Sequence, residues 1–306
     1  MNTRKQAALS RRGFIETAGL AGVGAWLARS AKAQGAPLPL ITKAIPASGE
    51  RIPAIGIGTD AFSKGARADI QAELQRMAEL GGTLIDTSDD YGDSEAIIGA
   101  ALAALGTRER MFLATKLSGA AGAEVFQRSL ERLRTQRVEL LQVHNLNGVA
   151  KLLPLMQEWK KAGRIRYLGV TTSRVSQHAE LLDVMRHYPL DFIQVDYSIA
   201  NRDAAAAILP LALERRCAVL INLPFGRSSL FREAASRKLP DWAADIDVGS
   251  WAQFFLKYVI SHEAVTCAIP GSTKVNHLVD NQGAGRGRLP DAALRQRMEQ
   301  YWDEKS

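Results

Sequence analysis

The sequence predicts an α/β fold, a single (β/α)8 (TIM) barrel, and three observations support this fold class. From residue 51 onward, short apolar runs alternate with segments whose apolar residues recur at three- and four-residue spacing, as strands and helices do. The number of apolar runs is eight. The chain has 306 residues, of which 46% are hydrophobic, and such a barrel takes about 250 residues as one domain.

The eight runs are predicted to form one parallel sheet. Several are apolar nearly throughout, which is typical of strands covered on both faces, and a right-handed crossover repeated eight times closes the sheet into a barrel. An open doubly wound sheet is the alternative, disfavoured because no G-x-G-x-x-G sequence follows any run. The predicted strands span residues 54–58, 83–85, 111–115, 140–143, 167–170, 192–195, 218–223 and 265–269.

The segments between the strands are predicted to be helices that pack one apolar stripe against the sheet. Two further elements are predicted outside the repeat. Residues 39–53, with the turn sequence Ala47-Ser48-Gly49-Glu50, indicate a β-hairpin over the barrel floor. Residues 286–302 indicate a final surface helix that starts near Pro290-Asp291. The helical stripes include Ile70/Leu74/Met77, Phe126/Leu130/Leu133, Leu152/Met156/Trp159, Leu181/Met185 and Trp251/Phe255/Tyr258.

The first 33 residues are predicted to be an export signal, and residues 34–306 the barrel domain. A basic stretch ends in S-R-R-G-F-I at residues 10–15, a Gly- and Ala-rich apolar run follows, and Ala31-Lys32-Ala33 fits an A-x-A cleavage site after Ala33. The adjacent arginines Arg11 and Arg12 resemble a twin-arginine signal, which implies the twin-arginine export machinery as a partner and a periplasmic location. The apolar run is too short for a stable membrane span, which takes about 20 residues.

Charge and cysteine content exclude several function classes. The net charge of +7 is concentrated in residues 1–33, which carry +5, so the remaining 33 basic and 31 acidic residues leave only +2. This balance predicts no nucleic-acid partner. The two cysteines, Cys217 and Cys267, have no metal-binding spacing and no metal site is expected. Both lie in short apolar runs at neighbouring predicted strands, Cys217 directly before one and Cys267 within the next, and two buried thiols are favoured there over a disulfide.

Polar residues close three consecutive strands, at the end of a barrel where catalytic side chains stand. Asp86 follows the second predicted strand, Lys116 the third and His144 the fourth, and Tyr91 lies in the loop after Asp86. Taken singly, each is an ordinary capping, solvated or loop residue. Their joint placement at one rim favours a catalytic group.

These four residues have the chemistry needed to donate a proton. A phenol has a pKa near 10, and a nearby ammonium lowers that pKa and favours the phenolate. We therefore expect Lys116 to tune Tyr91, Asp86 to fix Lys116, and His144 to hydrogen-bond a substrate carbonyl oxygen. The group would protonate a developing alkoxide.

The motifs around these residues resemble the aldo-keto reductase family. The stretch I-D-T-S-D-D-Y-G-D-S-E-A-I-I-G-A-A-L, residues 85–102, is similar to the family's D-T-A-x-x-Y-G-x-S-E signature, and A-T-K-L and Q-V-H-N follow in order. The resemblance covers residues 39–300. It implies a barrel, reversible carbonyl reduction with hydride from a nicotinamide cofactor, Tyr91 as the acid, Lys116 and Asp86 as its tuning pair, and His144 as the orienting residue.

The resemblance also implies a cofactor cleft, in which this chain departs from the family at several positions. Thr171-Thr172 replace a Ser-Asn pair, Asn222 stands where an aromatic side chain stacks, His277 replaces an arginine and Gly271 a lysine. Ser272, Lys274 and His277 still favour NADP(H) over NAD(H). The predicted cofactor-binding residues are Thr59, Thr171, Thr172, Gln194, Asn222, Pro224, Gly226, Arg227, Ser272, Lys274, His277 and Asn281.

The predicted function is therefore that of an exported NADP(H)-dependent oxidoreductase acting on a small aldehyde, ketone or sugar carbonyl. Asp60 stands where many relatives have a tryptophan after the first strand, and residues 227–249 show no informative pattern. The alternative is a non-redox barrel, an isomerase, a binding protein or a regulatory subunit, that retains the four residues without productive nicotinamide binding. The altered cofactor positions keep this alternative open.

Overall fold

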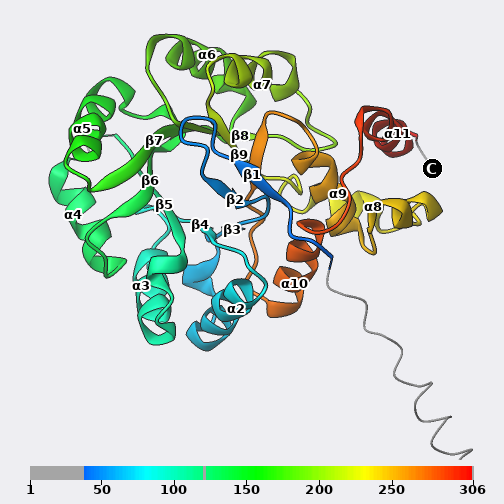
Figure 1. Cartoon of the computed structure of the whole chain (residues 1–306), viewed down its shortest axis with the longest axis horizontal. Helices are drawn as coiled ribbons and strands as arrows, with labels where there is room; N and C mark the ends of the chain where they lie inside the picture. Colours follow the sequence, from blue (N-terminus) through cyan, green and yellow to red (C-terminus); the bar gives the residue numbers. More distant parts are fainter. Residues whose placement is uncertain (1–37, 120–121, 305–306) are drawn as a thin grey trace, which may run out of the picture. The chain divides into compact units, whose positions relative to one another are not determined.

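A computed structural model of the chain describes residues 38–119 and 122–304, and it contains the predicted barrel. Eight parallel strands are hydrogen-bonded in sequence order, from β3 to β10, and surround a common centre in Figure 1. The predicted signal peptide and its boundary at residue 33 lie outside the described residues. The strands are β3 (Ile57–Gly58), β4 (Leu84–Asp86), β5 (Phe112–Leu117), β6 (Val138–Val143), β7 (Ile165–Thr171), β8 (Phe192–Asp196), β9 (Ala218–Asn222) and β10 (Val265–Ala268).

The barrel is closed by two short parallel bridges between its first and last strand segments. Ile55 pairs with Ala268, and Gly58 pairs with Gly271. A Cβ atom on Gly58 would lie 2.8 Å from the backbone oxygen of Ile269, so only glycine permits this approach. The first predicted strand, residues 54–58, is shortened to Ile57–Gly58 in β3. The reason is that the barrel is closed by isolated bridges at these residues and not by a continuous ladder of hydrogen bonds.

The predicted N-terminal hairpin is confirmed. β1 (Thr42–Ala44) and β2 (Arg51–Pro53) pair antiparallel, and their turn contains Gly49 with a φ of +77°. Ile45 and Ile52 pack inside the barrel with residues at the starts of the strands, such as Phe112 and Phe192. The hairpin therefore seals the N-terminal end of the barrel, across which it runs in Figure 1, and leaves the other end for a site.

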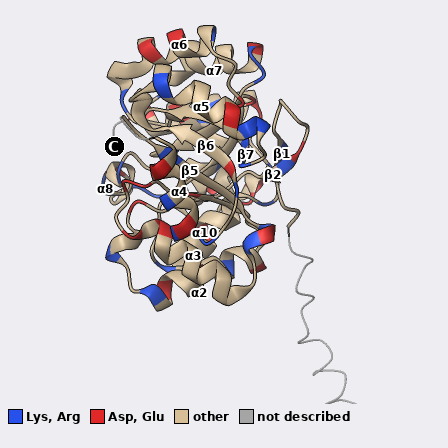
Figure 2. Ribbon diagram, turned by 90° about the vertical axis from the view of Figure 1, so that its left-hand side faces the viewer, with Lys and Arg blue, Asp and Glu red and all other residues tan. Residues whose placement is uncertain are grey.

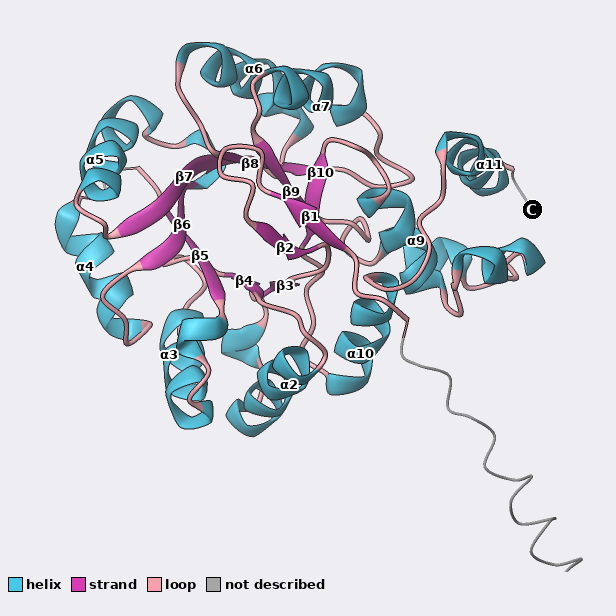
Figure 3. Ribbon diagram, in the orientation of Figure 1, coloured by secondary structure: helices cyan, strands magenta, loops and turns pink. Residues whose placement is uncertain are grey.

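Helices surround the strands, as Figure 3 shows. The predicted final helix is found as α11, which starts where Asp291 accepts a hydrogen bond from the backbone N–H of Leu294 at 2.8 Å. Residues 227–249, which showed no pattern, contain the short α8 and a 3-10 helix at Asp241–Ile246. The helices are α2 (Arg67–Glu79), α3 (Ser94–Leu105), α4 (Ala123–Arg132), α5 (Val149–Lys161), α6 (His178–His187), α7 (Ala204–Glu214), α8 (Ser229–Ala234), α9 (Trp251–Ile260), α10 (Val275–Ala284) and α11 (Ala292–Asp303).

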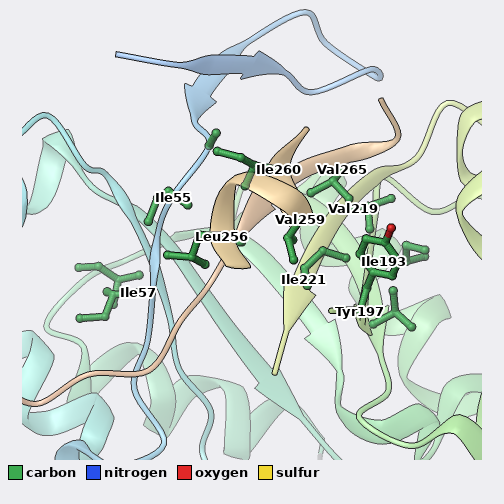
Figure 4. Close-up of a cluster of buried hydrophobic side chains, with 14 of the residues drawn as sticks. Ile55, Ile57, Ile193, Tyr197, Val219, Ile221, Leu256, Val259, Ile260 and Val265 are labelled. Atoms are coloured by element: carbon green, nitrogen blue, oxygen red, sulfur yellow. The ribbon is translucent and has the colours of Figure 1, made fainter. Parts of the chain in front are cut away.

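The hydrophobic residues form two layers, one on each side of the sheet. Outward-facing strand residues such as Ile193 and Val219 pack with the apolar stripe of α9, including Leu256 and Val259, as Figure 4 shows. A smaller cluster fills the barrel interior at the end that the N-terminal hairpin seals. Cys217 and Cys267 are both buried free thiols, as predicted.

Charged residues of both signs are interspersed over the helices on the face shown in Figure 2. Among the residues that the structure describes, no helix is both long and apolar enough to span a membrane. The same residues contain no group of three or more His, Cys, Asp or Glu side chains arranged to hold a metal ion.

Candidate active site

Inward-facing positions change from apolar to polar along the strands. Side chains at every second residue of a strand face the same side, so Phe112, Ala114 and Lys116 of β5 share the barrel interior. In β8 the same alternation runs from the apolar Phe192 to the polar Gln194. The apolar positions lie at the sealed end, and the polar positions therefore form a layer below the open mouth.

Asp86 lies at the centre of this polar layer and is almost fully buried, with 2% of its surface exposed. Lys116 donates to its Oδ2 atom at 2.5 Å, and Gln142 and Gln194 donate to its Oδ1 atom at 3.1 and 2.9 Å. Buried ion pairs are stable only when their remaining hydrogen-bonding groups are also satisfied. The two amides provide this for the carboxylate.

Lys116 is held by Asp86 and by the backbone oxygen of Thr87, which accepts from its Nζ atom at 2.7 Å. Burial lowers its pKa, but the negative charge of Asp86, with the hydrogen bonds to Asp86 and Tyr91, outweighs burial and raises the pKa above the usual value. Lys116 therefore carries its positive charge at neutral pH. Its Nζ atom lies 4.9 Å from the centre of the Tyr91 ring.

Tyr91 follows the β4 strand end in a tight turn, in which its N–H bonds to the oxygen of Ser88 at 3.2 Å. Burial raises the pKa of Tyr91, Lys116 lowers it and Asp86 raises it, and the net shift is upward. The expected lowering by Lys116 is present but smaller than the effect of burial. The predicted net lowering of the Tyr91 pKa is therefore wrong in direction, because the sequence shows charges and not desolvation.

His144 begins the 3-10 helix at His144–Leu146, directly after β6. Its ring meets the Tyr91 ring edge-on, with 5.8 Å between the centres. Its Nδ1 atom lies 3.3 Å from both Ser88 Oγ and Asp90 Oδ2. Burial and then the charge of Lys116 lower its pKa, so the imidazole is neutral at pH 7.

A cleft of about 620 Å³ opens from Tyr91 and His144 across the barrel mouth. Three of the predicted cofactor residues do not line it. Thr172 is buried and donates to Gln177 Oε1 at 2.7 Å, Gly226 only shapes a turn with its φ of +53°, and Asn281 is buried on α10. Those that line it are Thr59, Thr171, Gln194, Asn222, Pro224, Arg227, Ser272, Lys274 and His277.

The cleft has the chemical groups that a nicotinamide dinucleotide requires. Arg227, Lys274 and His277 line it and are suited to phosphate groups. The Oδ1 atom of Asn222 is buried and has no hydrogen-bond partner among the described residues, while its Nδ2 atom donates to the oxygen of Thr172 at 3.0 Å. A buried acceptor without a partner is costly, and the carboxamide N–H groups of a nicotinamide are suitable donors.

Sequence reasoning missed several residues of the site. Gln142 lies one residue before the end of β6 and two before His144, so inspection of the residues that close the strands passed over it. The period-two alternation that includes His144 is the signal that finds it. Asn145 and Ser173, in the loops after β6 and β7, also line the cleft, as does Phe225. No pattern in the sequence marked these three residues.

A (β/α)8 barrel with a buried Lys–Asp pair below a tyrosine and a histidine, beside a cleft suited to a dinucleotide, defines a class of proton-donating barrel enzymes. Residues 54–300 match the sequence profile of the Aldo/keto reductase family, and the chain belongs to this family. The family predicted from the motifs is thereby confirmed.

Individual relatives agree with this assignment. The chain is 29% identical to methylglyoxal reductase YeaE of Escherichia coli, in a match covering 82% of this chain and 92% of the relative. It is 25% identical to the NADP(+) aldo-keto reductase yakc of Schizosaccharomyces pombe, covering 81% and 88%. Its fold is similar to that of an aldo/keto reductase from Klebsiella pneumoniae solved with NADP and acetate, with a TM-score of 0.71, 24% identity, and coverage of 84% and 95%.

Proposed function

We propose that this chain is an NADP(H)-dependent oxidoreductase that reduces the carbonyl group of a small aldehyde, ketone or sugar, with Tyr91 as the general acid. One observation carries the proposal: the ammonium of Lys116, fixed on buried Asp86, lies 4.9 Å from the Tyr91 ring at the mouth of the barrel. This geometry serves a phenol that gives up a proton. The family assignment and the oxidoreductase relatives support the same chemistry.

The side chains divide the work as follows. When bound, the nicotinamide cofactor supplies the hydride. Tyr91 donates its proton to the carbonyl oxygen as that oxygen gains negative charge, and Lys116 stabilises the phenolate that remains. In the tautomer in which Nδ1 accepts from the Ser88 hydroxyl, neutral His144 donates from Nε2 to the same oxygen, whereas donation from Nδ1 to Asp90 Oδ2 leaves Nε2 as an acceptor.

The cofactor preference is proposed from the cleft and from the relatives. Ser272, Lys274 and His277 lie together at its wall and offer a hydroxyl, an ammonium and an imidazole to a 2′-phosphate. One similar reductase carries NADP(+) in its name, and one similar structure was solved with NADP. We therefore place the 2′-phosphate of NADP(H) beside these residues.

Export is proposed from the sequence alone. The twin arginines Arg11 and Arg12 and the Ala31-Lys32-Ala33 site support passage through the twin-arginine machinery to the periplasm. Replacing both arginines by lysine should leave the protein uncleaved in the cytoplasm, as cell fractionation would show. Cleavage and export of that variant would contradict the proposed route.

A fluorescence titration of the full chain with NADPH, and separately with NADH, tests the proposed function. Saturable binding that is tighter for NADPH is expected, followed by oxidation of NADPH with a carbonyl substrate. Methylglyoxal is the first substrate to test, because one relative is named for its reduction. If neither cofactor binds, the chain is instead a non-redox barrel that retains the catalytic group.

A further inference from the structure

A buried carboxylate lies beneath the wall of the cofactor cleft. Glu73, in the middle of α2, has 0% of its surface exposed. Neither of its carboxylate oxygens has a hydrogen-bond partner among the residues described. An ionised carboxylate that is buried without compensation is strongly unfavourable. Glu73 therefore lowers the free energy of unfolding, and we look for a function that explains its presence.

Glu73 is adjacent to the loop that faces the cleft. Burial raises the pKa of Glu73, and the nearby Ser272 hydroxyl and Lys274 backbone N–H lower it by less, because neither approaches the carboxylate with the geometry of a complete hydrogen bond. These two groups are already bonded to each other, since Lys274 N–H donates to Ser272 Oγ at 3.1 Å. Ser272 and Lys274 line the cleft and Glu73 does not. The carboxylate therefore lies behind the loop that we assign to the 2′-phosphate.

Within the described part of the chain, no countercharge compensates Glu73. α2 packs against α10 and α3, and the described charged or titratable groups on these elements do not shift its pKa through their charges. The effects on its pKa are burial, the Ser272 hydroxyl and the Lys274 amide alone. The groups in question are Lys274, His277 and Asp280 at or on α10, Glu95 on α3, and Arg67, Asp69, Arg76 and Glu79 on α2 itself.

We propose that Glu73 is a positioning residue that couples binding of the cofactor's 2′-phosphate to uptake of one proton. The inference rests on the proposed function, because it assumes a phosphate monoester at Ser272 and Lys274. A phosphate dianion there repels an ionised Glu73 through the loop, whereas the protonated carboxyl group tolerates it. NADP(H) therefore binds best to the protonated form, and the cofactor without a 2′-phosphate does not distinguish the two forms.

Two other groups at the same place must be separated from Glu73. Ionisation of the 2′-phosphate itself strengthens its attraction to Lys274 as the pH rises, which is opposite in sign to the Glu73 effect. His277 lines the same cleft and contacts the proposed phosphate site independently of Glu73. A His277→Asn variant therefore serves as the matched control.

The experiment measures dissociation constants of NADPH and NADH for the full chain between pH 5 and pH 9, without substrate. Wild type, Glu73→Gln and His277→Asn are compared. We expect the preference for NADPH over NADH to decrease as the pH rises in the wild type and in His277→Asn. This decrease should be about tenfold larger than the decrease in Glu73→Gln, since one pKa unit corresponds to a factor of ten. Calorimetry in buffers of different ionisation enthalpy should show proton uptake that Glu73→Gln loses.

The possible outcomes separate the role of Glu73 from the proposed function. If the pH dependence and proton uptake of Glu73→Gln equal those of the wild type, the role of Glu73 is overturned while the proposed function stands. If neither cofactor binds the wild type, the proposed function fails, and this inference with it. If Glu73→Gln does not fold, Glu73→Leu replaces it in the same titrations. In addition, the proton uptake of the wild type on binding 2′,5′-ADP is compared with its uptake on binding 5′-AMP. Equal uptake with both nucleotides overturns the inference.

Discussion

The side-chain amide of Gln142 lies 3.1 Å from Oδ1 of Asp86, the carboxylate oxygen that Lys116 leaves free. Gln194 shares the same oxygen at 2.9 Å and approaches Gln142 Oε1 at 3.4 Å. The carboxylate is thus held by side chains from three other strands, β5, β6 and β8. This arrangement fixes the direction of the Lys116 ammonium toward Tyr91, and Gln142 does so without lining the cleft itself.

Replacement of Gln142 by methionine should weaken this support. A hydrogen bond to a charged group contributes about 1.5–3 kcal/mol, so we expect the free energy of unfolding to fall by that amount and turnover to fall with it. Urea denaturation and steady-state kinetics measure both quantities. Gln71→Met, on the exposed face of α2, is the control and should leave both unchanged. An equal loss in the two variants would mean that Gln142 has no special role.

Replacement of Lys116 should lower the free energy of unfolding as well as the activity. Lys116→Met leaves Asp86 buried without its cation, and breaking a buried ion pair in this way costs about 3–5 kcal/mol. The double variant Lys116→Met/Asp86→Asn should recover most of the free energy of unfolding while remaining inactive. Urea denaturation of the three proteins checks this expectation. A double variant no more stable than the single one would show that the ion pair is not the cause.

Tyr91→Phe deletes the proposed proton donor and leaves the cleft intact. We expect a decrease in reductive turnover by a factor of about 10²–10⁴, with the NADPH dissociation constant within a few-fold of the wild type. Steady-state kinetics and fluorescence titration measure the two separately. Tyr301→Phe, on α11, is the matched control. Unchanged turnover in Tyr91→Phe would remove this residue from the mechanism.

Much of the fold and the catalytic group could be predicted from the sequence because both follow from local periodicity. The strand ends at Asp86, Lys116 and His144 are about one βα unit apart, and parallel strands bring equivalent ends to one rim. The short α8 could not be predicted in the same way, because six residues do not show a helical stripe. The bounds of β3 depended on barrel closure, which is a tertiary effect.

The chemistry of the site was less accessible from the sequence than its position. Charge contacts such as Lys116 with Tyr91 follow from the strand order, but burial, which determines the direction of the Tyr91 pKa shift, does not. Likewise, alignment of the cofactor positions placed Thr172 in the cleft wall, whereas its hydroxyl is bonded inside the protein to Gln177. Adjacent residues on a strand face opposite sides, and Thr171 is the one that lines the cleft.

Nuclear magnetic resonance titration of His144 should give a pKa below the ordinary value of 6.5, because burial and the charge of Lys116 both disfavour the imidazolium. In the unfolded chain this histidine gains a proton at higher pH than in the folded protein. The unfolded state therefore binds more protons just below pH 6.5, and the stability associated with neutral His144 is present above pH 6.5 and lost as the pH falls.

Asp90 raises the pKa of His144, so Asp90→Asn should lower it further. His144→Gln identifies the resonance and should abolish this part of the pH dependence. A His144 pKa above 6.5 would instead make the imidazolium the hydrogen-bond donor to the carbonyl oxygen.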